Sequence, residues 1–134
     1  MKCSICGKEI SGHGHNPFPV SFVGQCCDRC NDKVVMPVRL FMASRDKQNY
    51  AMLIKENEVV LVKPDKKYFT LKEKREMVGG YITVRPSCFP GYYDVVAEEG
   101  KLKKLYFNNL SYLMFNTEYV GNVLICPVKL FEKS

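Results

Sequence analysis

The sequence predicts an α+β protein in which a small cysteine-rich module precedes a small antiparallel sheet with one or two helices. Three observations lead to this prediction: two C-x-x-C pairs near the N-terminus, short apolar segments separated by turn residues from position 50 onward, and a helix start signal among those segments. The 134 residues, 46% of them hydrophobic, suffice for one core with a small module attached. The predicted divisions are a module at 1–42, a polar linker at 43–49 and an α+β unit at 50–134.

The N-terminal module is expected to contain a short strand at 20–23 and a helix at 27–39 that begins at the second cysteine pair. Asp28 falls in the first turn of that helix, where a negative charge suits the helix dipole. Pro37 lies inside the helical pattern and predicts a helix end or kink near Met36. One face of the helix is predicted from residues spaced four apart, which are Cys30, Val34, Val38 and Met42.

The α+β unit begins with a predicted hairpin of strands 50–55 and 58–62. Thr70 and Glu73 stand in the spacing of a capping box, which predicts a helix from 71 to 78, and Gly79-Gly80 ends it. The remaining predicted elements are a strand at 81–85, a hairpin of strands 92–97 and 102–107, a helix at 109–115 capped by Asn108, and a strand at 120–126.

The two C-x-x-C pairs have the spacing of a zinc site. Two cysteines three residues apart on a tight turn point the same way, and two such turns supply the four sulfurs that tetrahedral zinc prefers. The predicted ligands are Cys3, Cys6, Cys27 and Cys30. A site closed by four cysteines has no open position for water, so the zinc is expected to be structural, and its removal is expected to disorder residues 1–42.

Three neighbouring residues are alternative ligands. Cys26 is adjacent to Cys27, but its spacing to Cys30 is wider than C-x-x-C, so Cys27 is preferred. His13 and His15 could also bind metal, although a solvated loop is the simpler reading of both when four cysteines are present.

The charge of the chain gives a weak indication of nucleic-acid binding. The formal net charge is +6, but four thiolates add −4 and zinc adds +2, which leaves about +4. Two lysine groups lie beside tyrosine and phenylalanine, a combination that can hold single-stranded nucleic acid or a nucleotide by charge and stacking. Lysines on the solvated face of a strand are the alternative. The two groups are Lys63, Lys66 and Lys67, and Lys101, Lys103 and Lys104.

The sequence contains no recognisable catalytic pattern, so we do not expect an enzyme. It has no Walker-type loop, and its two histidines both fall in the N-terminal module. Cys88 is the candidate for a reactive thiol, but no histidine follows to activate it, and Cys126 is expected to be buried. Without an apolar run suited to a signal peptide or a membrane span, and with seven cysteines, a cytoplasmic location without a membrane partner is expected.

Two resemblances extend this interpretation. Residues 1–42 resemble a treble-clef zinc finger, in which hairpin material after the first cysteine pair is followed by a helix that carries the second. Most of the remaining chain resembles a bacteriophage-associated family of uncharacterised proteins with a helix–V-G-G-Y-I–strand core. The matching segments are A-M-L-I-K-E-N at 51–57, T-L-K-E-K-R-E-M-V-G-G-Y-I-T-V at 70–84, D-V-V-A-E-E-G-K-L at 94–102 and V-G-N-V-L-I at 120–125. The resemblance implies a small antiparallel sheet with a helix packed on it, but no chemistry.

These observations together favour a non-enzymatic, zinc-stapled accessory protein that binds a host or phage protein and inhibits a host process or defence, in the cytoplasm of the host cell if phage-encoded. The alternative is binding of nucleic acid or sequestration of a small nucleotide through the lysine groups. An exposed apolar patch that includes Phe89, Tyr92 and Tyr93 would favour the first, and a continuous positive surface would favour the second.

Overall fold

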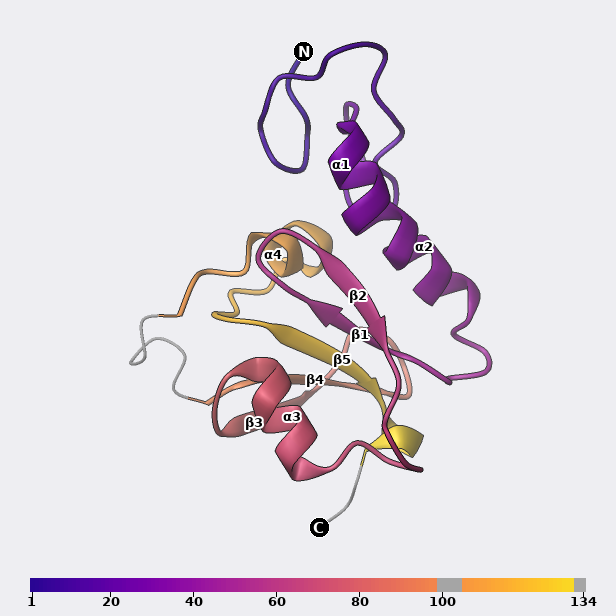
Figure 1. The fold of residues 1–134 in the computed structure, drawn as a ribbon, viewed down its shortest axis with the longest axis vertical. Helices are drawn as coiled ribbons and strands as arrows, with labels where there is room; N and C mark the ends of the chain where they lie inside the picture. The colour runs from indigo at the N-terminus through magenta and orange to yellow at the C-terminus, as the bar shows by residue number, and fades with distance from the viewer. Residues whose placement is uncertain (99–104, 132–134) are drawn as a thin grey trace.

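A five-stranded antiparallel sheet with helices on both faces forms the centre of the molecule (Figure 1). The computed structural model describes residues 1–98 and 105–131. The strand order across the sheet is β2-β1-β5-β4-β3, and every neighbouring pair is antiparallel. The α+β prediction is therefore confirmed. The strands are β1 (Ala51–Ile54), β2 (Val59–Val62), β3 (Ile82–Pro86), β4 (Tyr92–Ala97) and β5 (Val123–Pro127).

The register of the strands follows their apolar residues. In the first hairpin Ala51 pairs with Val62 and Ile54 pairs with Val59, as the sequence predicts. Strand β5 lies between β1 and β4, and all five of its residues are buried. Its side chains alternate between two apolar clusters, one on each face of the sheet, because successive strand residues point to opposite sides.

One face of the sheet is covered by a long N-terminal helix and by α4 (Asn109–Phe115). The long helix consists of α1 (Asp28–Cys30), the π-helical turn η1 (Asn31–Val35) and α2 (Met36–Ala43). Of the helix end or kink expected near Met36, the end is wrong, because the helix continues to Ala43. Proline has no N–H to donate at position 37, so one hydrogen bond of a regular α-helix is missing there. The preceding turn is π-helical, with the Met36 amide donating to the Asn31 carbonyl, and the helix continues through Pro37.

The other face is covered by α3 (Leu71–Val78). Its capping box forms as predicted: the Glu73 amide donates to Thr70 Oγ1, and the Thr70 amide donates to Glu73 Oε1. Gly79 ends the helix with a positive φ of 89° and donates its amide to the Arg75 carbonyl. Lys74 is buried on this helix, with its Nζ 3.5 Å from the centre of the Phe131 ring.

Two predicted strand segments differ from the structure. Residues 20–23 form turns and bends, because Val20 and Ser21 both donate their amides to the Pro17 carbonyl. The expected hairpin of 92–97 with 102–107 is wrong, since β4 pairs with β3 on one side and β5 on the other. Residues 102–104 lie outside the described residues, and Phe107 forms an isolated bridge with Val120.

The N-terminal module and the sheet share one apolar core. Val34, Val38 and Phe41 of the long helix belong to the same buried cluster as Met52 and Ile125 of the sheet. The cluster also reaches into the cysteine-rich segment through Cys3, Val20, Cys26 and Cys30. Residues 44–48, within the predicted linker, form a turn that returns the chain from the helix to β1. The module is therefore packed against the sheet.

Asn108 ties three segments together from a fully buried position. Its Nδ2 donates to the carbonyls of Ile54 and Gly121 at 3.0 and 2.9 Å, and its Oδ1 accepts from the Ser111 amide at the start of α4. Asn108→Ala leaves these three backbone groups without their partner, so we expect the free energy of unfolding to fall by about 2–4 kcal/mol. Urea denaturation measures this change. Asn109→Ala, at the exposed next residue, is the matched control, and an equal loss in both variants would contradict the prediction.

Candidate metal centre

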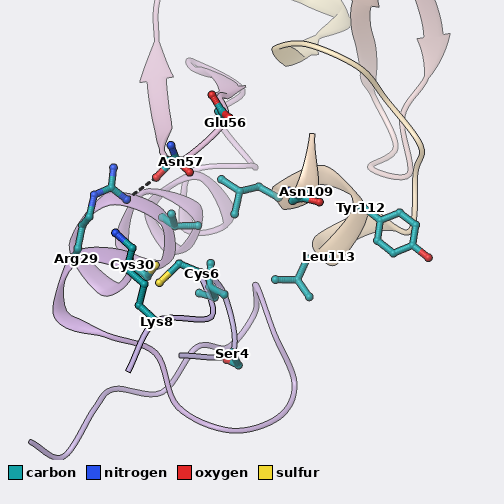
Figure 2. A pocket seen from close by; sticks show the side chains of 13 residues that line it. Ser4, Cys6, Lys8, Arg29, Cys30, Glu56, Asn57, Asn109, Tyr112 and Leu113 are labelled. Carbon is teal, nitrogen blue, oxygen red and sulfur yellow. Dashed lines mark hydrogen bonds between the residues drawn. The ribbon is translucent and has the colours of Figure 1, made fainter. Parts of the chain in front are cut away.

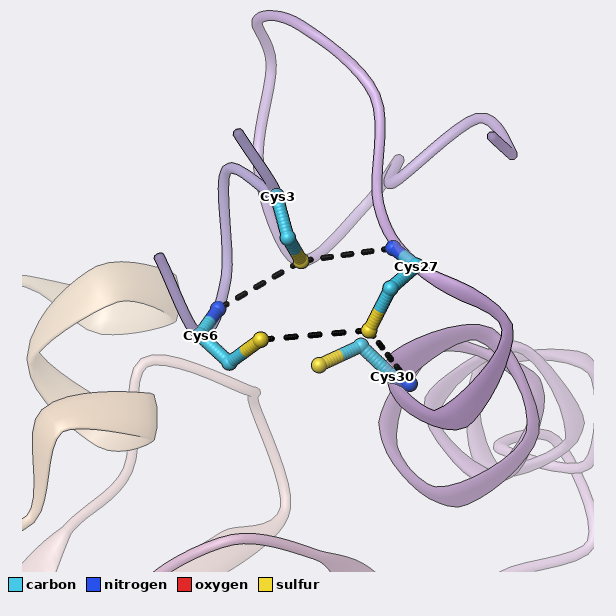
Figure 3. A group of neighbouring side chains, drawn as sticks. All are labelled: Cys3, Cys6, Cys27 and Cys30. Carbon is cyan, nitrogen blue, oxygen red and sulfur yellow. Dashed lines mark hydrogen bonds between the residues drawn. The ribbon is translucent and has the colours of Figure 1, made fainter. Parts of the chain in front are cut away.

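Four cysteine sulfurs converge at the N-terminal end of the long helix (Figure 3). The Sγ atoms of Cys3, Cys6, Cys27 and Cys30 all lie within 4.8 Å of one another. The Sγ atoms of Cys6 and Cys27 are 3.8 Å apart. A tetrahedral zinc with four Zn–S bonds of about 2.3 Å requires sulfur–sulfur separations of about 3.8 Å. The cluster therefore has the size of a four-sulfur metal site.

Two local structures bring the sulfurs together. The first is a tight turn closed by the bridge between Lys2 and Glu9, in which Gly7 adopts a φ of 79° and donates its amide to the Cys3 carbonyl. The second is the start of the helix, where Cys27 is the N-cap and its Sγ accepts from the Cys30 amide at 3.5 Å. Each C-x-x-C pair thus sits on a turn that directs both sulfurs to one side.

Backbone amides surround the Cys3 sulfur. The amides of Ile5, Cys6 and Cys27 donate to Cys3 Sγ at 3.3–3.4 Å. Burial raises the pKa of the Cys3 thiol, but these amide donors outweigh burial and lower its pKa to about 6. Burial raises the pKa of Cys6 and Cys30. Amides directed at a sulfur favour its thiolate form, which is the form that binds metal.

The alternative ligands lie apart from the cluster. Cys26 is fully buried in the apolar core, and its backbone forms a bridge with His15. His15 Nε2 lies 2.6 Å from Asp28 Oδ1, so this histidine contacts the first turn of the helix. His13 is exposed and is not part of the four-sulfur group.

The residues present fit a metal ion such as zinc. Four sulfur donors within 4.8 Å of one another, with amides that favour the thiolate of one of them, match the donor set of a structural site. Because four protein ligands complete a tetrahedron, such a site holds a fold together and leaves no position for a reacting water.

A cleft of about 520 Å³ lies between the cysteine module and the sheet domain (Figure 2). One wall belongs to the first cysteine turn and the helix start, and the other to the β1–β2 turn and α4. The Arg29 guanidinium donates to the Asn57 carbonyl at 2.8 Å and joins the two walls. Four segments distant in sequence build this cleft, so no local pattern could have predicted it. Its lining includes Ile5, Lys8, Val34, Glu56, Leu110 and Leu113.

Only one of the two predicted lysine groups lies within the described residues. Lys63, Lys66 and Lys67 are exposed; Lys63 Nζ lies 4.7 Å from the centre of the Tyr50 ring, and Lys67 Nζ lies 5.3 Å from that of Tyr68. The second group, Lys101, Lys103 and Lys104, lies outside the described residues. A continuous positive surface that unites the two groups stays a prediction.

Cys88 lies near a buried acid that the sequence gave no reason to single out. Asp94 is buried in β4, and its Oδ2 accepts from the Tyr119 hydroxyl at 2.8 Å. Burial raises the pKa of Asp94, and the hydrogen bond from Tyr119 and the charge of Arg85 only partly offset this. Burial, together with the charge of Asp94, also raises the pKa of Cys88, which is opposite to what an activated nucleophile needs.

The expected aromatic patch is not exposed. Tyr92 is buried, and Phe89 and Tyr93 pack against the two apolar clusters of the sheet. The ring of Phe41 on the long helix lies 5.8 Å from Phe89 and 5.4 Å from Tyr92. Phe89 and Tyr92 therefore join the helix to the sheet, whereas Tyr93 packs on the opposite face beside Phe131.

In comparisons with known proteins, no family model, no curated protein and no solved structure matches the chain. The resemblance to phage proteins thus rests on the sequence segments alone. Among residues 1–98 and 105–131, none of the helices combines the length and the apolar composition of a membrane span.

We predict that the purified protein binds one zinc ion per chain. Removing the ion by a chelator is expected to release residues 1–27, a shorter segment than the 1–42 expected from the sequence, because the helix shares its core with the sheet. Zinc binding contributes on the order of 10–16 kcal/mol to small modules. This segment otherwise adds mainly small side chains to the apolar core, with Cys3, Val20 and Cys26 buried and Ile5, Ile10 and Cys27 partly buried. Helix α2 stays packed, because Val38 and Phe41 are buried against the sheet. Hydrogen exchange before and after chelation measures both effects. Unchanged amide protection in 1–27 would contradict the prediction.

Two cysteine variants distinguish the metal ligands from a cysteine that is only adjacent to them in the sequence. We expect Cys6→Ser to weaken zinc binding by more than about 100-fold in a chelator competition assay, because it removes one of four sulfurs. Cys26→Ala, which changes a buried cysteine outside the cluster, is expected to keep one zinc per chain.

We predict that Asp94→Asn gains stability relative to the wild type as the pH rises. An ordinary aspartate ionises near pH 4, and burial raises the pKa of Asp94 in the folded protein. The wild type therefore loses stability as the pH rises above about 4 through that raised pKa, whereas asparagine carries no charge and can still accept from Tyr119. Urea denaturation of zinc-loaded protein between pH 5 and 8 measures the difference. The control is Asp46→Asn at an exposed position, and a pH-independent difference for Asp94→Asn would refute the prediction.

Proposed function

We propose that this chain is a non-enzymatic, zinc-stapled accessory protein that binds a protein partner through the cleft between its cysteine module and its sheet. The observation that carries the proposal is the cleft itself. Its volume of about 520 Å³ falls in the range of ligand-binding clefts, and it lies at the junction of two structural units, where such sites are common.

The composition of the cleft resembles that of a protein interface. Val34 and Leu110 are buried within its lining, and Leu113 and Tyr112 are exposed large apolar residues on α4. The Tyr112 ring also contacts exposed Phe107, with the ring centres 5.8 Å apart. Lys8, Arg29 and Glu56 provide polar groups around these apolar residues. An apolar centre with a polar rim is the usual anatomy of a protein–protein contact.

The metal site couples to this surface. Cys6 and Cys30 belong to both the four-sulfur cluster and the cleft lining. A zinc ion held by these sulfurs would fix the first cysteine turn, and with it one wall of the cleft, against the helix. Pre-organising a binding surface in this way lowers the entropy lost on binding.

The resemblance of segments such as 51–57 and 70–84 to phage proteins supports a partner in the host cell, whose process or defence the protein would inhibit. Binding of nucleic acid or a nucleotide through Lys63, Lys66 and Lys67 with the later lysines is the alternative. It predicts an affinity that falls steeply with salt, since each phosphate contact releases counterions.

Affinity purification of the full chain from bacterial cells, with two matched variants, tests the proposal. Leu113 and Val84 are exposed to nearly the same extent, 38% and 37%, but only Leu113 lines the cleft. We expect wild type and Val84→Asp to retain the same protein, and Leu113→Asp to bind it at least about tenfold more weakly.

Three results would overturn the proposal: equal retention of the captured protein by Leu113→Asp, absence of any retained protein, or a nucleotide bound to the purified wild type in native mass spectrometry. Zinc content of both variants provides the folding control.

A further inference from the structure

A second exposed apolar surface lies on another face of the long helix and is not used by the proposed function. Five large apolar side chains form it, and Phe22 and Val23 are 80% and 73% exposed. We call this surface the loop–helix patch; it consists of Phe18, Phe22 and Val23 from the loop and Met36 and Leu40 from the helix.

The loop holds its apolar side chains outward. Pro17, Val20 and Ser21 are buried, and the amides of Val20 and Ser21 both donate to the Pro17 carbonyl. With this backbone anchored, Phe18 and Phe22 face solvent, and their ring centres lie 5.4 Å apart. The anchored loop therefore holds these apolar side chains in a solvent-exposed position.

Arg39 joins the loop to the helix. Its Nε donates to the Phe18 carbonyl at 2.9 Å, and its Nη2 donates to the Asn16 carbonyl at 3.0 Å. Met36 and Leu40 flank Arg39 in the sequence and, being four residues apart, lie on one exposed face of α2. The loop backbone at 16–18 is therefore held against the helix next to Met36 and Leu40 in the sequence.

The size of the patch favours a second copy of the chain. Its five side chains expose an apolar area on the order of 600 Å², at the upper end of what a monomer leaves uncovered. A stable dimer buries about 800 Å² on each copy, so the patch with its rim is sufficient. In a twofold dimer the same patch lies on both sides of the interface, so the apolar side chains of one copy contact those of the other.

Charges along the helix also fit a twofold arrangement. Asp32 lies four residues before Met36, and Arg39 lies three residues after it. Neither has an ion-pair partner among residues 1–98 and 105–131. If two helices cross antiparallel near Met36, Asp32 of each copy approaches Arg39 of the other.

We propose that the loop–helix patch is the interface of a homodimer. The two helices cross antiparallel near Met36, and Phe18 and Phe22 of each copy pack against the apolar residues of the other. This inference does not rest on the proposed function, because no residue of the patch lines the cleft.

Sedimentation equilibrium of the zinc-loaded full chain, in a phosphine reductant that prevents disulfides, tests the proposal. We expect a mass of about twice 15.4 kDa at tens of micromolar protein. Phe22→Ser is expected to weaken the dimer by at least about 100-fold, because the twofold symmetry places the substitution on both sides of the interface. Asp32→Lys is expected to weaken it by about tenfold through repulsion of Arg39. The matched control, Tyr68→Ser, changes an exposed aromatic residue outside the patch and should leave the mass unchanged.

Phe22 is so exposed that its replacement should not affect folding, and zinc content checks this. A wild type that remains at 15.4 kDa would overturn the proposal, as would a dimer that Phe22→Ser does not weaken. A monomer that instead co-sediments with phosphatidylcholine–phosphatidylglycerol vesicles would assign the patch to a membrane surface and equally overturn it.

Discussion

The convergence of four cysteine sulfurs within 4.8 Å is the constraint on which the N-terminal part of the structure depends. Residues 1–27 contribute mainly small side chains to the core: Cys3, Val20 and Cys26 are buried, and Ile5, Ile10 and Cys27 are partly buried. Their own backbone bridges are isolated pairs. Four neighbouring thiolates would repel one another without a cation, and a zinc ion would turn that repulsion into four bonds. The metal would therefore supply the stability that so short a segment cannot obtain by burying apolar surface.

The long helix transmits this local order to the rest of the molecule. It begins at Asp28, with Cys27 as its N-cap and Cys30 in its first turn, and it ends at Ala43. Its residues Val38 and Phe41 are buried against the sheet. The π-helical turn before Pro37 keeps the helix continuous in spite of the missing amide hydrogen. Because one rigid element carries both two sulfurs and part of the core, the cysteine module is held in a fixed position on the sheet.

This arrangement leaves two apolar surfaces on different faces of the helix. The cleft near Leu113 is concave, bordered by charged side chains and adjacent to the sulfur cluster. The loop–helix patch is made of side chains that an anchored loop holds in solvent. A homodimer formed through the patch would present two clefts, so binding of a partner at both would gain from avidity.

The sequence by itself determined the features that depend on neighbouring residues. The C-x-x-C spacing identified the four converging sulfurs, Thr70 and Glu73 identified the capping box, and the apolar residues around 56–57 identified the first hairpin. Tertiary structure decided which strands are neighbours: β5 lies between β1 and β4, and its pairing with β4 excludes the hairpin expected after residue 97. It also determined that Tyr92 is buried, that Phe22 is exposed and that four segments together form the cleft. Local patterns record hydrogen bonds and side-chain spacing within a few residues, whereas strand order and exposure depend on how distant segments share one core, which no local pattern contains.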